Sequence, residues 1–261
     1  MGEMIGKQSV KFAEAPYIFE GASVVGPKEG EGPLGKLFDV IEQDPMLGSK
    51  SWEEAESLLQ KETVQKLLLK SGLKKEDIRY IFAGDLLGQL IATTFGIMDY
   101  EIPFMGLYGA CSTMGEGLSL AAMMVAAGYG ENVIAMASSH FGSAERQFRF
   151  PLEYGNQRPF SATWTVTGCG AAIVTKRKGF ARITGVTTGK IIDYGVKDAQ
   201  NMGACMAPAA ADTYIRWFQA SGTSPADYDA IVTGDLGIIG SNLFCDLLMK
   251  QGYDAAGIHQ D

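Results

Sequence analysis

The chain has 261 residues, of which 46% are hydrophobic and 20% are charged, a composition typical of a globular protein and not of a disordered or coiled-coil chain. Its net charge of −8 disfavours general nucleic-acid binding, and any anionic ligand would need a local pocket of positive potential. The four cysteines are widely spaced and include no C-x-x-C pair, so the sequence predicts neither a zinc site nor a disulfide framework.

No segment of the sequence is predicted to cross a membrane. The N-terminus lacks the basic region and the apolar core of a signal peptide. The longest apolar stretch, residues 118–127, is about half of the ~20 residues that a membrane span requires. Peripheral attachment to a membrane through a partner stays open.

Strand and helix patterns alternate through the first two thirds of the chain. A capping box at Ser51 and Glu54 predicts a helix that ends at Gly72, and a second, apolar helix is predicted from Met114 to Ala127. Short apolar runs predict strands at residues 18–25, 80–83, 102–108, 133–137 and 171–175. Because these strands are apolar on more than one face, we expect an α/β fold with a parallel sheet covered by helices.

Part of the sequence recurs at a constant offset of 150 residues. Residues 71–86 align with residues 221–236 without a gap. The two segments share Ser-Gly at their start, one Asp and one Ile at matching positions, and Gly-Asp-Leu at their end. Each segment follows a predicted helix, and the second of these helices is predicted to begin near Pro208. A chance match in a glycine-rich chain is one explanation. We interpret the match as a duplication that produces two similar α/β halves, residues 1–178 and 179–261.

The duplication also predicts that the second half is incomplete. After Leu86 the first half continues to Thr175, whereas 25 residues follow Leu236. We therefore expect a chain that is truncated at its C-terminus. A naturally shorter second half is the alternative.

Cys111 is the sharpest candidate for chemistry. The run 109–113, Gly-Ala-Cys-Ser-Thr, joins a predicted strand to a predicted helix, and free N–H groups at a helix N-terminus can lower a thiol pKa or hold a carboxylate. A nucleophilic cysteine also needs a histidine or asparagine nearby. The two histidines, His140 and His259, lie in no recognisable catalytic motif. The alternative is therefore a structural role, in which Cys111 is simply a small residue that closes the turn between strand and helix.

Arg146 and Arg149 form the main concentration of positive charge that we identify in the sequence. They would share one face of a helix, and the guanidinium fork suits carboxylates. Their position after His140 indicates a dicarboxylate site. A structural clamp with Glu145 and Glu153 is the alternative.

These motifs together resemble a known family. The 109–113 elbow, the Gly-Cys-Gly-Ala turn at 168–171 and the two related halves are similar to the thiolase fold of thiolases and ketoacyl synthases. Within that fold, the chain resembles the stage V sporulation protein AD family of spore-forming Firmicutes. The residues that carry this closer resemblance are 26–28, 32–35, 37–39, 83–87, 109–113, 138–140, 144–149, 153–155, 204–212 and 233–236.

The resemblance implies a layered αβαβα architecture of two similar halves. It also implies a role in sporulation: binding of dipicolinic acid during its uptake into the forespore, beside membrane proteins of the same operon, on the cytoplasmic side of the forespore inner membrane. A homodimer follows by analogy with the fold. No nucleic-acid partner, metal or cofactor is expected.

The resemblance leaves two functions open. Cys111 aligns with the thiolase-type nucleophile, which makes an acyltransferase the alternative to a binding protein without catalysis. Asp235 stands where many condensing enzymes carry a catalytic histidine, which argues against acyl transfer. For the binding function we expect the ligand to contact Cys111, Ser112, His140, Arg146 and Arg149.

Overall fold

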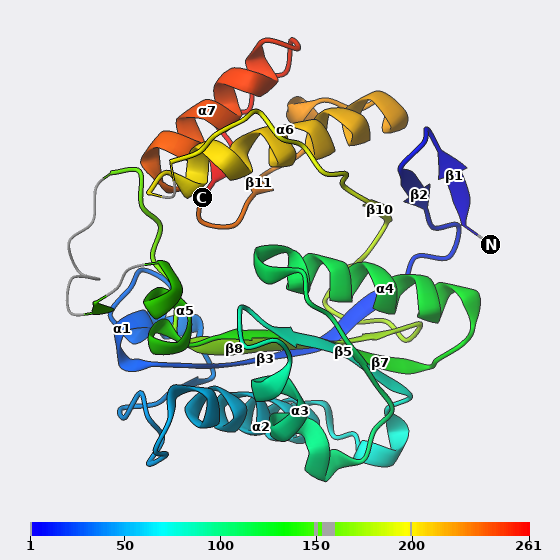
Figure 1. Cartoon of the computed structure of the whole chain (residues 1–261). Helices are drawn as coiled ribbons and strands as arrows, with labels where there is room; N and C mark the ends of the chain where they lie inside the picture. Colours follow the sequence, from blue (N-terminus) through cyan, green and yellow to red (C-terminus); the bar gives the residue numbers. More distant parts are fainter. Residues whose placement is uncertain (1, 149–150, 153–159, 199) are drawn as a thin grey trace. The chain divides into compact units, whose positions relative to one another are not determined.

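The computed structural model describes residues 2–148, 151–152, 160–198 and 200–261 (Figure 1). The chain divides into two compact units. Within the described ranges, unit 1 comprises Phe12–Leu152 and Thr165–Thr184, and unit 2 comprises Gly2–Lys11, residues 160–164 and Gly185–Asp261.

A mixed sheet forms the centre of unit 1. Its strands are β3 (Tyr17–Val25), β4 (Val40–Ile41), β5 (Tyr80–Asp85), β6 (Phe104–Gly106), β7 (Asn132–Ser139), β8 (Gly168–Thr175) and β9 (Ala181–Arg182). The order is β4-β3-β8-β7-β5-β6, with β9 paired to β3. The predicted parallel sheet is wrong for β8, which runs antiparallel to both β3 and β7. Apolar periodicity reports burial on the two faces and carries no information on strand direction.

Helices cover both faces of this sheet. The helices of unit 1 are α1 (Pro27–Gly30), α2 (Trp52–Ser71), α3 (Ile91–Ile97), α4 (Thr113–Ala127) and α5 (Phe141–Phe148). The α2 and α3 helices lie on one face and α4 lies on the other (Figure 1). Successive side chains of β7 point to opposite faces of the sheet, so each face can pack on a different helix. Ile134 belongs to the core cluster that contains Leu59 of α2, whereas Ala135 faces Gly117 of α4.

The small residues of α4 that face the sheet follow from this position, among them Gly117, Ala121 and Ala122. By length and composition, one stretch of the described residues, Ala110–Ala127, could cross a membrane. In the structure it is α4 with its preceding turn, and α4 packs on β5, β7 and β8. The helix has the sheet contacts that a core helix of a globular protein has.

Unit 2 is built around two helices that pack on each other, α6 (Met202–Ser221) and α7 (Gly237–Met249). Its core is aromatic and includes Phe218 and Phe244, which are at most 2% exposed. The parallel pair β11 (Ile231–Val232) and β12 (His259–Gln260) and the antiparallel sheet β1 (Glu3–Ile5), β2 (Ser9–Lys11) and β10 (Gly185–Thr187) complete the described part of the unit.

The structure confirms the duplication. Both α2 and α6 have 20 residues and begin and end at positions that differ by 150. Gly72 and Gly222 end them in the left-handed conformation, with φ of 67° and 70°. The short turns Lys75–Asp77 and Pro225–Asp227 that follow keep the same offset.

The predicted start of the second repeat helix near Pro208 is wrong. The helix begins at Met202, where the side chain of Asn201 accepts a hydrogen bond from the Ala204 N–H (3.2 Å) and caps the first turn. Pro208 lies inside the helix and is buried. A proline is favourable in the first turn but does not by itself mark where a helix begins.

A chain of buried polar side chains links α2 to β5, β7 and α3. The Ser138 hydroxyl donates to Glu56 Oε1 (2.7 Å), and the Gln60 amide donates to Ser138 Oγ (2.6 Å) and Thr93 Oγ1 (3.0 Å). The Thr93 hydroxyl donates in turn to Asp85 Oδ2 (2.9 Å). Glu56 is 1% exposed, and burial raises the pKa of its carboxyl to about 7, with a smaller contribution from the charge of Asp85.

Because the pKa of the Glu56 carboxyl is raised, we expect the free energy of unfolding to depend on pH. An unfolded glutamate ionises near pH 4.5 and folded Glu56 near 7, so between these values the unfolded chain binds fewer protons. Glu56 should therefore contribute a fall in stability of about 3 kcal/mol as the pH rises through this window, opposed by His140 and His259, whose pKa values are lowered. In urea unfolding between pH 4.5 and 8, the change in stability of the native chain and of the exposed control Glu14→Gln should be more negative than that of Glu56→Gln by about this amount. An equal slope in all three proteins would contradict the assignment.

Candidate functional site

The candidate site is a tight elbow between β6 and α4. After β6, the Leu107 N–H donates to the Ala83 carbonyl (2.8 Å), and one 3₁₀ turn, Ala110–Ser112, leads into α4. Ala110 has φ of 48°, a left-handed conformation that costs a residue with a Cβ about 1–2 kcal/mol. Such strain is typical of functional turns, where the surrounding structure imposes it.

Close backbone contact fixes this elbow against β5. A Cβ on Gly84 would lie 2.0 Å from the Leu107 carbonyl oxygen, so only glycine fits at this point of the strand. Within the turn, a Cβ on Gly109 would lie 2.7 Å from both Glu116 Oε2 and Ser112 Oγ. The contact of Gly84 therefore sets the path of the chain toward Cys111, whereas a Cβ on Gly109 would displace only side-chain ends.

Cys111 is exposed, but its thiol is not activated. Desolvation of the thiol within the turn raises its pKa above the ordinary value. The expected lowering by the helix N-terminus is not found. Cys111 precedes the helix by one 3₁₀ turn, because α4 begins at Thr113. The thiol therefore stays protonated at neutral pH.

The first turn of α4 offers main-chain donors beside a negative charge. The Ser112 hydroxyl turns back to donate to the Gly109 carbonyl (2.8 Å). Thr113 is 1% exposed, and its hydroxyl has no hydrogen-bond partner within the described part of the chain. The Glu116 carboxylate lies in the same turn, beside Gly109. An anion at this helix end would meet both the helix N-terminus and that carboxylate.

His140 is buried, and both of its ring nitrogens are engaged. The Gly142 N–H donates to Nδ1 (3.1 Å), and Nε2 donates to the Pro45 carbonyl (2.8 Å). These two main-chain partners select the neutral tautomer, and burial lowers the ring pKa. The geometry gives His140 a structural role after β7, and its predicted contact with a ligand stays a prediction.

Arg146 forms a clamp between α5 and α2. Its guanidinium pairs with the Glu53 carboxylate and stacks over the Trp52 ring, 5.5 Å from the ring centroid. The clamp partner seen for Arg146 is Glu53, and Glu145 is buried and accepts from the Thr165 N–H (3.3 Å). The predicted Arg149, like Glu153 of the expected clamp, lies outside the described residues.

His259 makes its contacts within unit 2. Its Nε2 meets the Thr233 hydroxyl (3.0 Å), and its Nδ1 meets the Ser241 hydroxyl (3.1 Å) and the Cys245 sulfur (3.8 Å). Burial raises the pKa of the Cys245 thiol and lowers that of the His259 imidazole.

Asp235 accepts from the main-chain N–H groups of Gly237 and Trp164, as a turn-forming aspartate does.

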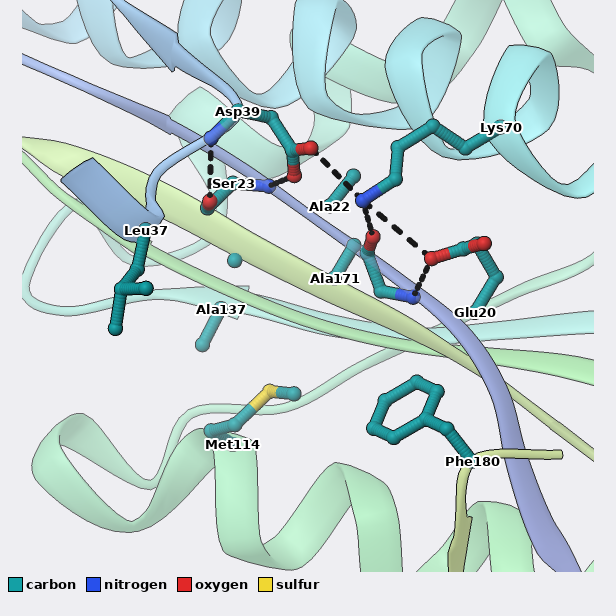
Figure 2. Close-up of a pocket in the computed structure, with 12 residues that line it drawn as sticks. Glu20, Ala22, Ser23, Leu37, Asp39, Lys70, Met114, Ala137, Ala171 and Phe180 are labelled. Carbon is teal, nitrogen blue, oxygen red and sulfur yellow. Dashed lines mark hydrogen bonds and ion pairs between the residues drawn. The ribbon is translucent and has the colours of Figure 1, made fainter.

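A hollow of about 510 Å³ lies beside the outer edge of β3 and was not predicted from the sequence (Figure 2). Its lining is mostly small or apolar, with one lysine and two carboxylates. The lining residues are Glu20, Gly21, Ala22, Ser23, Leu37, Asp39, Lys70, Met114, Ala137, Gly170, Ala171 and Phe180. Met114 belongs to the first turn of α4, so the hollow adjoins the helix that follows the elbow.

At this hollow, side chains form hydrogen bonds with main-chain groups on the open edge of β3. In the described structure the strand has β9 beside its first two residues and β4 beside its last two, with no strand neighbour on that side between them. There Lys70 donates to the Gly21 carbonyl (2.5 Å) and pairs with Asp39 (2.8 Å) and Glu20 (3.4 Å) (Figure 2). Asp39 also accepts from the Ser23 N–H (3.0 Å). Because these residues are distant in sequence, no local motif could reveal them.

Comparison with known proteins agrees with this geometry. The family model described as Stage V sporulation protein AD matches residues 6–261. The chain belongs to the stage V sporulation protein AD family. Stage V sporulation protein AD of Bacillus subtilis (strain 168) is 41% identical over 259 residues, which are 99% of this chain and 77% of that protein. The chain is thus a sporulation protein of this family.

Solved structures confirm the predicted thiolase-like fold. The 3-oxoacyl-(acyl-carrier-protein) synthase III of Aquifex aeolicus VF5 matches with a TM-score of 0.58 and 11% identity over 90% of this chain and 81% of that chain. A cerulenin-bound variant of OleA from Xanthomonas campestris matches with a TM-score of 0.59 and 13% identity over 99% of this chain and 83% of that chain. At these identities the likeness shows the fold alone.

The Lys70 contacts predict a measurable stabilisation of this stage V sporulation protein AD family member. Lys70→Ala would leave the Gly21 carbonyl and the Asp39 carboxylate short of a donor, which should cost about 1–3 kcal/mol. Lys61→Ala is the matched control, because Lys61 is on the same helix and pairs with the exposed Asp99; it should cost less than about 1 kcal/mol. Urea unfolding measures both, and equal costs would show that the β3 edge does not depend on Lys70.

Proposed function

We propose that this chain binds dipicolinate in its uptake into the forespore, without catalysis. In this proposal it works beside membrane proteins of the same sporulation operon, on the cytoplasmic side of the forespore inner membrane, and can form a homodimer. The membership of the stage V sporulation protein AD family supports the sporulation role. The chemistry of the elbow supports binding over catalysis.

The observation that carries the proposal is an exposed Cys111 elbow, while both ring nitrogens of His140, the candidate base, are held by main-chain groups. Acyl transfer needs a thiolate and a base that can exchange protons with it. Here the pKa of the Cys111 thiol is raised, and both ring nitrogens of His140 are held by main-chain groups. The N–H groups of Ser112 and Thr113 already donate to the carbonyls of Gly109 and Ala110, so the proposal draws on the N–H groups that follow them in the first turn of α4 to hold a carboxylate.

Dipicolinate is a planar aromatic compound with two carboxylates. One carboxylate would meet the N-terminal turn of α4 at Cys111 and Ser112, and the second needs a cation. Arg146 is the cation that the proposal assigns; its side chain is 41% exposed and pairs with Glu53 of α2, and within the described residues no hydrogen bond or ion pair joins it to the elbow. The guanidinium has five N–H donors, so it can hold Glu53 and a second carboxylate together.

Calorimetric titration of dipicolinate into the chain tests this proposal. We expect saturable binding that isophthalate, which lacks the ring nitrogen, does not reproduce. Arg146→Ala should weaken binding about tenfold, the effect of losing one hydrogen bond to a charged group, and Cys111→Ala should weaken it less, because it removes a weak S–H donor and keeps the main-chain N–H groups. The control Arg216→Ala should bind normally, since Arg216 is 42% exposed and pairs with Asp212 in unit 2. Normal affinity in both test variants would refute the assigned site.

Removal of the negative charge at the elbow should strengthen binding. Glu116 lies in the first turn of α4, where its carboxylate opposes an incoming anion. Glu116→Gln should raise the affinity for dipicolinate about two- to fivefold at low salt, which corresponds to about 0.3–1 kcal/mol. The gain should shrink at high salt, because salt screens exposed charges. The same titration at two ionic strengths measures it, and a loss of affinity would place the ligand elsewhere.

Acyl transfer through Cys111 is the second candidate. The strained Ala110 beside the exposed Cys111, on a thiolase-like fold, favours it. Incubation with acyl-coenzyme A followed by mass spectrometry decides between the two functions. The binding proposal predicts no acyl adduct on Cys111 at neutral pH, with Cys111→Ser as the reference. An adduct that forms on Cys111 and turns over would establish the acyltransferase.

A further inference from the structure

A second concentration of positive charge lies at residues 176–182, which we call the basic tip. Its sequence, Lys-Arg-Lys-Gly-Phe-Ala-Arg, has four cations and one aromatic residue in seven positions. This is denser than the segment around Arg146 that stood out in the sequence analysis. In a chain with a net charge of −8, such a cluster is unusual and requires a reason.

The fold holds the basic tip firmly on the end of β3. The tip follows β8 directly and ends in β9, which pairs with Tyr17 and Ile18. The Phe180 N–H donates to the Ile18 carbonyl (3.1 Å). A Cβ on Gly179 would lie 2.0 Å from that same carbonyl oxygen, so the turn sits directly against the strand. The backbone of the tip is therefore preorganised.

One of the four cations, Arg177, stabilises the folded position of the basic tip. Arg177 donates to Asn132 Oδ1 (3.2 Å) and stacks over the Phe19 ring, 4.3 Å from its centroid. That contact ties the tip to β3 and to the start of β7. Arg177 is thus accounted for by folding.

The other charged groups of the tip have no such role. Lys176, Lys178 and Arg182 are exposed, and none of them forms an ion pair within the described part of the chain. Among the described residues these cations stay unpaired although a carboxylate is near in the sheet: Glu131 precedes Asn132, and Asn132 pairs with Thr175, the residue before Lys176. Phe180 lies between Lys178 and Arg182 in the sequence and has 72% of its surface exposed, and it also lines the hollow that contains Glu20 and Asp39.

We propose that the basic tip docks on the surface of an anionic lipid bilayer. Lys176, Lys178 and Arg182 would contact acidic headgroups, and Phe180 would enter the interface between the headgroups and the acyl chains. Cations flanking an exposed aromatic side chain suit a surface that is negative outside and apolar beneath. The inference rests on the proposed function, because it supplies a contact for the membrane location given there.

A bilayer fits this surface better than a nucleic acid does. A nucleic acid that followed the protein surface beyond the tip would meet the repulsion of a chain with net charge −8. A bilayer needs to contact only this short, exposed segment. Each cation near an anionic membrane contributes about fivefold to binding, so three cations with one aromatic anchor give weak, reversible and salt-dependent attachment.

Sedimentation of the chain with lipid vesicles tests this inference. We expect binding to phosphatidylcholine vesicles that contain 30% phosphatidylglycerol, weaker binding at high salt, and none to phosphatidylcholine alone. The double variant Lys176→Glu/Lys178→Glu and the single variant Phe180→Ser should each lose at least tenfold. The control Lys36→Glu/Lys50→Glu carries the same charge change at exposed positions elsewhere in unit 1 and should lose less than threefold.

Three outcomes would overturn the inference: no binding of the native chain to the anionic vesicles, equal losses in the test and control variants, or binding to a duplex oligonucleotide without binding to vesicles. Calorimetry with dipicolinate on Lys176→Glu/Lys178→Glu separates this inference from the proposed function. Retained dipicolinate affinity with lost vesicle binding supports both. Failure of dipicolinate binding in the native chain, with intact vesicle binding, would contradict the proposed function alone.

Discussion

The structure of unit 1 depends on the close backbone contact between β5 and the elbow. Gly84 lets the Leu107 carbonyl approach where any Cβ would collide with it. This contact sets the path of the chain from β6 into the strained Ala110 and then into α4. The position of Cys111, the exposure of its thiol and the first turn of α4 all follow from that path, because the turn has little freedom left once β5 and α4 are both packed.

The same elbow explains why binding is the better account of function. A thiolase-like fold presents a cysteine at the start of a helix, but a nucleophile also requires a lowered thiol pKa and a base that is free to act. Desolvation raises the pKa of Cys111, and His140 is fixed by Gly142 and Pro45. What the binding proposal can still use is the start of α4, where the N–H groups that follow Thr113 and the helix dipole favour a carboxylate. The family assignment and the fold are compatible with either function, so the argument rests on these local groups.

The sequence predicted those features that local patterns encode. The Ser51 cap, the Gly72 and Gly222 helix ends and the offset of 150 residues are short-range signals, and each is found in the structure. The start of α6 was mispredicted although its Asn201 cap is a local signal. The direction of β8 was mispredicted and the pairing of Arg146 with Glu53 was not anticipated, because both depend on neighbours far along the chain. The Lys70 contacts at the β3 edge are of the same kind. The elbow was located from sequence, but the sign of the Cys111 pKa shift depends on packing that sequence does not show.

Protection of Cys111 from alkylation by dipicolinate tests the central claim most directly. Cys205 is also exposed and lies on α6, so it serves as an internal reference in the same sample. The account predicts that dipicolinate slows the reaction of iodoacetamide with Cys111, saturating at the concentration that saturates the calorimetric titration, while Cys205 reacts at an unchanged rate. Equal alkylation rates at Cys111 with and without saturating dipicolinate would contradict the claim that the ligand occupies the elbow.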